Sequence, residues 1–160
     1  MSEMETIFLT SGLSIFGGVF VFSFGQLMQK FLLEPAQEQA KVIGEVLFNL
    51  TYYAAWYANP GTGKEDDLVK ASNIIRESAS RLKATTNAVR WYCLCSTFRL
   101  VPPIGNVDKA IRNLIFISNS VHSGNGRDNR EHADEVEELI VPRWGLCLTR
   151  RSKRTAHKRA

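Results

Sequence analysis

Cysteine is the residue type in this 160-residue chain with the widest chemistry, as nucleophile, metal ligand or disulfide partner. Cys93 and Cys95 flank Leu94 in an apolar run, and Cys147 lies far along the chain. Structural zinc sites normally use two closely spaced ligand pairs, and a C-x-C motif with one distant cysteine lacks the second pair. An odd number of cysteines also argues against a disulfide framework. We therefore interpret Cys93 and Cys95 as packed thiols and expect no metal site.

The histidines and one glycine-bearing turn are the other candidates for catalysis or cofactor binding. His122, His132 and His157 cannot be paired with a nucleophile by spacing. The run 60–64, PGTGK, resembles a phosphate-binding loop but lacks the G-x-x-x-x-G-K-[ST] spacing and has Glu65 where a hydroxyl is needed. It also follows a predicted helix rather than a strand. We interpret it as a plain turn and expect a non-enzymatic protein without a cofactor.

An uncharged stretch of 24 residues, Thr6–Gln29, lies between Glu5 and Lys30. As an α-helix it would be about 36 Å long, enough to cross a hydrocarbon core of about 30 Å. A core helix normally keeps a polar face, whereas this stretch has large apolar residues all the way round. The pattern predicts a single transmembrane helix over residues 6–29, after a short leader over residues 1–5.

Other interpretations of this stretch are weaker but stay open. A secretory signal needs a basic start and a small-residue cleavage site, and the chain begins instead with Glu3 and Glu5. Thr10, Ser11, Gln26 and four glycines make the stretch only moderately apolar. An interfacial helix or a core helix therefore remains an alternative.

Small residues in the predicted span are spaced so that two helices could approach closely. Ser14 and Gly18 are four residues apart, and Gly17 and Gly25 are eight apart. Small-x-x-x-small spacing permits close helix pairing in membranes. We therefore include a homo-oligomer among the expected partners.

Basic residues follow the predicted span but do not precede it. Lys30, Lys41 and a basic C-terminus lie on one side, so the positive-inside rule predicts a single-pass inner-membrane protein with its N-terminus outside and its C-terminal body in the cytoplasm. Lys30, Phe31, Leu32 and Leu33 come directly after the span. We expect these four residues at the membrane–water interface, with the Lys30 ammonium extended toward lipid phosphates.

The last part of the chain, residues 143–160, is strongly basic. It has seven Lys or Arg residues and no acid, which leaves residues 1–142 with 13 basic and 16 acidic residues, although the whole chain is +4. Such a tail can bind anionic lipids. We expect it to bind nucleic acid only weakly, because Trp144 is the one residue on which a base could stack. We expect the tail to be solvated and disordered, with contact to anionic lipid or nucleic acid as the alternative. The candidate contact residues are Arg150, Arg151, Lys153, Arg154, Lys158 and Arg159.

The body between the span and the tail, residues 30–142, shows helical periodicity and no strand pattern. We expect an all-α bundle of three to four helices. Asn106 is the expected cap of the third helix, residues 122–134 form a polar loop, and Pro35 either kinks a continuing helix or starts a new one. The predicted helices cover residues 36–57, 66–92, 107–120 and 131–141.

The run Gly25–Pro60 resembles a group of uncharacterised small bacterial proteins with one N-terminal span and a helical cytoplasmic body. The shared motif is G-Q-x-x-x-K-F-x-x-E-P-x-Q-E, and the A-S-x-x-I-R-x-x-A-S-x-L segment at Ala71–Leu82 is similar in style. The resemblance implies this topology and a bacterial setting but no activity. The basic ending after Pro142 departs from the group. The matching residues are Gly25, Gln26, Lys30, Phe31, Glu34, Pro35, Gln37 and Glu38.

Three functions are compatible with these features. The leading hypothesis is a membrane-anchored, non-enzymatic protein that binds a protein partner at the inner face of the membrane. The second is a membrane-active effector that acts through oligomerised spans. The third is a weak, sequence-independent nucleic-acid binder that uses the basic tail.

Overall fold

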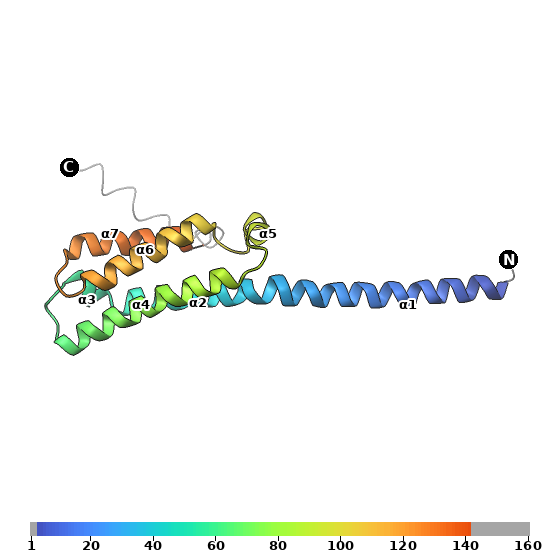
Figure 1. The fold of residues 1–160 in the computed structure, drawn as a ribbon, viewed down its shortest axis with the longest axis horizontal. Coiled ribbons are helices and arrows are strands. Elements are labelled where there is room, and N and C mark those ends of the chain that lie inside the picture. The colour runs from blue at the N-terminus through green and yellow to red at the C-terminus, as the bar shows by residue number, and fades with distance from the viewer. Residues whose placement is uncertain (1–2, 142–160) are drawn as a thin grey trace.

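The computed structural model describes the backbone of residues 3–141 and the side chains of residues 11–141. Within these residues the chain is helical and has no strand, which confirms the all-α prediction. Helix α1 (Glu3–Met28) projects as a long rod from one end of a body formed by the remaining helices (Figure 1). The basic tail over residues 143–160 lies outside the described residues.

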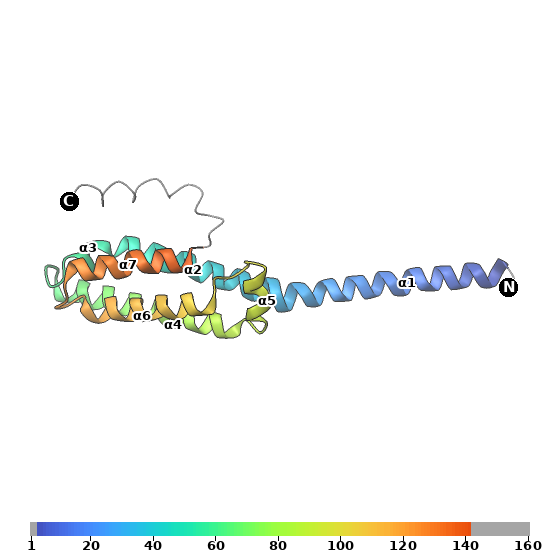
Figure 2. The same ribbon diagram turned by 90° about the horizontal axis from the view of Figure 1, so that it is seen from above.

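Helix α1 continues without a break through one π-helical turn, η1 (Gln29–Leu33), into α2 (Glu34–Tyr52). Pro35 lacks an N–H and its ring crowds the carbonyl four residues earlier in an α-helix. The π turn before it moves the hydrogen bonds one residue back, as the bond from the Glu34 N–H to the Gln29 carbonyl shows. Pro35 therefore lies in the first turn of α2, and α1 and α2 run along nearly one line (Figures 1 and 2).

Four helices form the body. Helix α2 packs against α4 (Glu65–Ala88), α4 against α6 (Ile104–Ser120), and α6 against α7 (Gly126–Ile140). Each contributes apolar residues at three- and four-residue steps, which lie on one helix face and are buried together. The first core consists of Val42, Ile43, Val46, Leu50, Tyr53, Tyr57, Leu68, Ala71, Ile75, Ala79, Leu82, Val107, Ala110, Ile111, Leu114, Ile117, Val121, Ala133, Val136 and Ile140.

The predicted helix over residues 36–57 is wrong near its end. The chain leaves the helical conformation at Tyr53 (φ −93°, ψ 13°) and then forms a short helix, α3 (Ala54–Ala58). Helix α3 is joined to α7 by a 2.8 Å hydrogen bond from the Asn129 side-chain amide to the Tyr57 carbonyl. This contact bridges 72 residues of sequence, so apolar spacing alone could not predict it.

The predicted helix over residues 66–92 is also too long. Helix α4 ends at Ala88, and the extended residue Val89 (ψ 98°) carries the chain into a separate short helix, α5 (Tyr92–Thr97). The extended conformation brings the Val89 side chain into a second core at the base of α1. The second core consists of Leu32, Ala36, Val89, Cys95 and Val101, with Met28 and Tyr92 packed against it.

The starts of the last two long helices differ from the predicted ones. Helix α6 begins at Ile104 after the cap residue Pro103, so Asn106 is not a helix cap. Helix α7 begins at Gly126, where the Asn125 side chain accepts a 3.1 Å hydrogen bond from the Arg127 N–H. Residues 126–134 of the predicted loop 122–134 are therefore helical, because Asn125 caps α7 earlier in the sequence than expected.

Candidate membrane anchor and binding surfaces

The described surface of α1 is apolar on every side. No residue of its most apolar 18-residue window is buried by the rest of the chain, and within residues 3–141 it belongs to the one helix long and apolar enough to cross a membrane (mean hydropathy 1.4). A core helix would be covered by its own chain, so α1 is not a core helix of the single protein. The large apolar side chains of α1 that are more than half exposed are Leu13, Ile15, Phe16, Val19, Phe20, Val21, Phe22, Phe24 and Leu27.

The four residues predicted for helix pairing lie along α1 without a partner element from the described chain. Ser14 is exposed. A Cβ atom added at Gly17, Gly18 or Gly25 would meet nothing within 4 Å. These positions are therefore open to a neighbouring helix, and the single chain does not supply one.

The four residues predicted for the membrane interface do not share one environment. Phe31 is 39% exposed, Leu33 is 45% exposed, and Lys30 is exposed, whereas Leu32 is only 6% exposed. Leu32 lies on the side of η1 that faces α5 and packs in the second core with Val89. Consecutive residues on a helix point in different directions, so this segment divides between the second core and the surface.

A buried polar network fixes α5 against α2 and α4. The fully buried Gln39 amide donates to the Thr86 hydroxyl at 2.9 Å and to the Tyr92 hydroxyl at 3.2 Å. The Tyr92 hydroxyl donates to the Pro102 carbonyl at 2.7 Å. Burial raises the pKa of Tyr92, while the hydrogen bond from Gln39 acts in the opposite direction. The network positions the segment after α4 at the base of α1.

An aromatic strip lies on the outer side of α2 and α3. The ring centroids of Phe48 and Tyr52 are 5.8 Å apart, and those of Tyr52 and Trp56 are 6.3 Å apart, both in stacked geometry. Phe48 and Tyr52 are 66% and 59% exposed, while the adjacent Tyr53 is buried in the first core. The strip of Phe48, Tyr52 and Trp56 is rigid, partly solvated and large enough to serve as an anchor for a protein partner.

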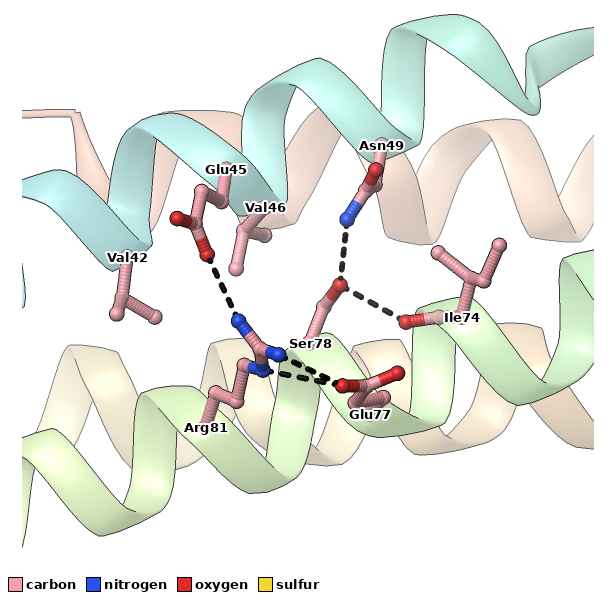
Figure 3. A pocket seen from close by; sticks show the side chains of 8 residues that line it. All are labelled: Val42, Glu45, Val46, Asn49, Ile74, Glu77, Ser78 and Arg81. Carbon is pink, nitrogen blue, oxygen red and sulfur yellow. Dashed lines mark hydrogen bonds and ion pairs between the residues drawn. The ribbon is translucent and has the colours of Figure 1, made fainter.

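A groove of about 160 Å³ separates α2 from α4, and Figure 3 shows the side chains around it. Arg81 pairs with Glu77 at 2.9 Å and with Glu45 of α2 at 3.5 Å. The Ser78 hydroxyl accepts a hydrogen bond from the Asn49 amide and donates to the Ile74 carbonyl. These polar groups bond to one another, so we interpret the groove as part of the packing contact between α2 and α4.

The remaining residues considered for chemistry are dispersed over the body. His122 lies 3.8 Å from the Glu65 carboxylate, and the His132 ring packs on Phe116 with centroids 4.3 Å apart. Cys95 is buried in the second core, and Cys93 is exposed. Among residues 3–141, no three His, Cys, Asp or Glu side chains are grouped closely enough to hold a metal ion.

Cys147 and His157, which were considered for chemistry, fall beyond Val141 and so lie outside the described part of the chain. The predicted contact residues of the tail also lie outside it: Arg150, Arg151, Lys153, Arg154, Lys158 and Arg159. Within the described part, sequence analysis missed the outer surface of α5, because it described this stretch only as an apolar run. The signal was available as the dense aromatic and aliphatic run around Cys93 and Cys95.

Comparison with known proteins does not identify a family for this chain. No protein-family model, no curated protein and no solved structure matches the chain. The function must therefore be inferred from two features of the chain itself, the exposed apolar helix α1 and the surfaces of the body that it carries.

Proposed function

We propose that this protein is a non-enzymatic helical protein that is anchored in the inner membrane by α1 and binds a protein partner through its body. The observation that carries the proposal is the apolar surface of α1, which the described chain leaves uncovered. Fully burying one large apolar side chain is worth about 1.5–3 kcal/mol. The exposed residues of α1 together therefore favour a lipid environment strongly over water.

The orientation follows from the distribution of basic residues. Lys30 and Lys41 follow the apolar part of α1, which favours a cytoplasmic body and an external N-terminus. Because α1 and α2 form one continuous rod, the body would stand on the membrane and present the far end of α2 away from it.

The aromatic strip is the surface best suited to a protein partner. Aromatic side chains dominate the energetics of protein interfaces, and stacked rings lose little conformational freedom on binding. Phe48 stacks on Tyr52, and both side chains stay more than half exposed. A partner would therefore dock near the end of α2 that is farthest from α1.

Extraction of membranes with alkaline carbonate tests the anchor. We expect the full chain to stay in the membrane pellet and to dissolve only in detergent. A matched variant, Val21→Arg, places a charge in the middle of α1, where a charge disfavours membrane insertion by about 3 kcal/mol. More of this variant should be extracted by carbonate. Full extraction of the unaltered chain would contradict the proposal.

A photo-crosslinking amino acid at Tyr52 tests the partner surface. We expect one discrete crosslinked protein from membranes, and we expect its loss when Phe48 is replaced by Ser. Val69, which is exposed on α4 outside the strip, is the matched control position and should give no such product. Identical products from both positions would show that the strip has no special role.

A second function, a membrane-active effector, is favoured by the open space around the glycines of α1. Close pairing of spans through Gly17 and Gly18 would assemble several copies in the bilayer. Overexpression should then arrest growth, and Gly17→Leu with Gly18→Leu should relieve the arrest while leaving the protein in the membrane. Equal toxicity of this variant would exclude helix pairing through these glycines.

A further inference from the structure

The segment that carries α5 exposes an unusual amount of apolar surface. Half of the exposed large apolar side chains of residues 34–141 fall between residues 91 and 104. Phe98 and Trp91 are 67% and 55% exposed, although aromatic side chains in a helical body are usually covered. The exposed residues of this segment are Trp91, Leu94, Phe98, Leu100 and Ile104.

This surface lies at the base of α1. The inner side of α5 packs through Cys95 on Leu32, with Met28 and Tyr92 against the same cluster. Both views show α5 beside the junction of α1 and α2, at the end of the body nearest to α1 (Figures 1 and 2). The exposed side of the α5 segment therefore adjoins the place where the apolar surface of α1 ends and Lys30 begins.

The charges of the same segment suit an anionic surface. Residues 84–107 include Arg90 and Arg99 and no Asp or Glu. Both arginines are exposed, and neither forms an ion pair with the described chain under standard distance criteria. The opposite end of the body carries charges of both signs, for example Lys64 and Glu65 at the start of α4. The α5 segment thus differs from it in having basic residues and no acid.

The turn that ends α5 places Arg99 in the left-handed backbone region (φ 58°). The Leu100 N–H donates to the Cys95 carbonyl at 2.9 Å, and the Arg99 N–H donates to the Ser96 carbonyl at 3.0 Å. This is the helix ending in which glycine usually occupies the position of Arg99, because other side chains are strained there. The strained position carries a cation between the exposed side chains of Phe98 and Leu100.

We infer that residues 90–104 form a second membrane contact, a wedge that inserts its apolar side chains among the headgroups of the leaflet next to α1. Trp91 and Phe98 are suited to the interfacial zone, and Arg90 and Arg99 would lie against lipid phosphates. The inference rests on the proposed anchoring by α1, and its occupant is an anionic lipid surface. Together, α1 and this second contact would fix the rotation and tilt of the body relative to the membrane. A single span would leave both free.

Fluorescence quenching with the full chain in vesicles tests the wedge. Exposed Cys93 carries an environment-sensitive fluorophore, Cys147→Ser removes the competing thiol, and buried Cys95 stays in place. The vesicles contain equal parts of phosphatidylethanolamine and phosphatidylglycerol. We expect quenching of the Cys93 probe by lipids that carry a nitroxide near the headgroup, and protection from aqueous iodide.

Two further probes separate failure of the wedge from failure of the anchor, each in the Cys93→Ser, Cys147→Ser background. A probe at Val21→Cys should be quenched by lipid, and a probe at Val69→Cys at the far end should be quenched by iodide only. If Val21 is quenched by lipid but Cys93 by iodide, the anchor stands and the wedge is wrong. If Val21 is quenched by iodide, both are wrong. Protection of Cys93 from both quenchers would mean that protein covers α5, which also overturns the inference.

Removing the charges of Arg90 and Arg99 tests the electrostatic part of the inference and alters none of the described hydrogen bonds. Arg90→Gln with Arg99→Gln should lower the ratio of lipid-docked to undocked Cys93 by about fivefold for each charge removed. Replacing phosphatidylglycerol with phosphatidylcholine should act in the same direction. The matched control, Lys64→Gln with Lys70→Gln at the far end, should leave quenching unchanged. Equal effects of the two double variants would overturn the role of the α5 arginines.

Discussion

The two ends of the helical body are closed in different ways. At the far end, the turn after α3 and the turn before α7 are joined by hydrogen bonds, including a 3.3 Å bond from the Gly61 N–H to the Val121 carbonyl. Buried Asn129 links the same region to Tyr57. At the near end, beside α1, the α5 segment is fixed by a buried network on its inner side, while Phe98 and its neighbours stay exposed.

The difference shows that the chain can seal a helix connection when the connection faces water. The far end uses Asn, whose side chain forms hydrogen bonds with backbone groups, and Gly, whose conformational freedom permits tight turns. The near end uses aromatic and aliphatic residues with two arginines. The two far-end turns, residues 59–64 and 121–125, expose no large apolar side chain, so the exposure of the α5 connection distinguishes it from them, as expected if it faces lipid. The predictions below probe each end in turn.

The largest expected effect comes from Asn129→Ala at the far end. The change removes the donor to the Tyr57 carbonyl and the acceptor of the Ser120 hydroxyl. Leaving buried polar groups unpaired costs about 1–3 kcal/mol each, so we expect a loss of about 3 kcal/mol in the free energy of unfolding. Urea denaturation measures it. Asn119→Ala removes an exposed acceptor of Arg76 and should lose far less; similar losses would contradict the sealed-end account.

A somewhat smaller loss is expected from Gly126→Ala. A Cβ atom at Gly126 would clash with the Ala58 carbonyl oxygen, so the two turns would have to separate. Such overpacking costs about 1–3 kcal/mol. Gly44→Ala in α2 is the matched control, because its Cβ would meet nothing within 4 Å and alanine favours a helix by about 1 kcal/mol. Thermal unfolding should therefore shift in opposite directions for the two variants.

At the near end, Arg99→Gly should stabilise the fold by about 1 kcal/mol, because glycine adopts the left-handed conformation without strain. Arg99→Ala keeps the strain and should give no such gain. Both variants should weaken lipid docking of the α5 segment. Urea denaturation in detergent measures stability, and quenching of the Cys93 probe measures docking. Stabilisation by both variants would show that the arginine side chain, rather than the backbone, disfavours the fold.

The smallest effect concerns two tyrosines whose pKa is raised, one at each end of the body. Burial raises the pKa of Tyr57, with Asp134 and Glu137 acting in the same direction. Above the ordinary value of 10.0 the unfolded chain loses this proton while the folded chain keeps it, so stability falls as pH rises. Tyr57→Phe should flatten that fall and leave stability below pH 10.0 nearly unchanged, as alkaline denaturation curves can show. An unchanged slope would contradict the assignment.

Tyr92→Phe offers a contrast with Tyr57→Phe. It should also flatten the alkaline fall, because burial raises the pKa of Tyr92. It should in addition destabilise the protein below pH 10.0, because it removes the bond to the Pro102 carbonyl and the acceptor for Gln39. The two variants therefore distinguish the Tyr92 hydroxyl, which is hydrogen-bonded in the network of the near end, from the Tyr57 hydroxyl at the far end.

Apolar spacing predicted much of the fold correctly. The regularly spaced apolar residues of α4, from Leu68 to Leu82, are buried in the first core, because a long helix with a regular apolar stripe has one way to face a core. The helix breaks were not predictable, since Tyr53 and Val89 leave the helix to satisfy contacts that are distant in sequence. Gln39 was missed as well, because its burial depends on partners in α4 and α5.

The candidate surfaces were predicted less completely than the fold. The apolar length of α1 was evident, since it is a property of one continuous segment. Leu32 was grouped with its exposed neighbours because the position of α5 could not be known. The division of the α5 segment into a packed inner side and an exposed outer side depends on the second core, which joins residues 28–36 to residues 89–101.

The most direct test of the account is the height of the far end of the body above the membrane. The 19 residues of α2 rise about 28 Å, so a probe at Tyr52→Cys in the Cys93→Ser, Cys147→Ser chain should lie about 30 Å above the lipid surface. Energy transfer to acceptor lipids measures this distance, with the Cys93 probe as the near reference. Strong transfer from Cys93 and weak transfer from Tyr52 would support a body that stands on its α5 end. Equal transfer from both probes would contradict it.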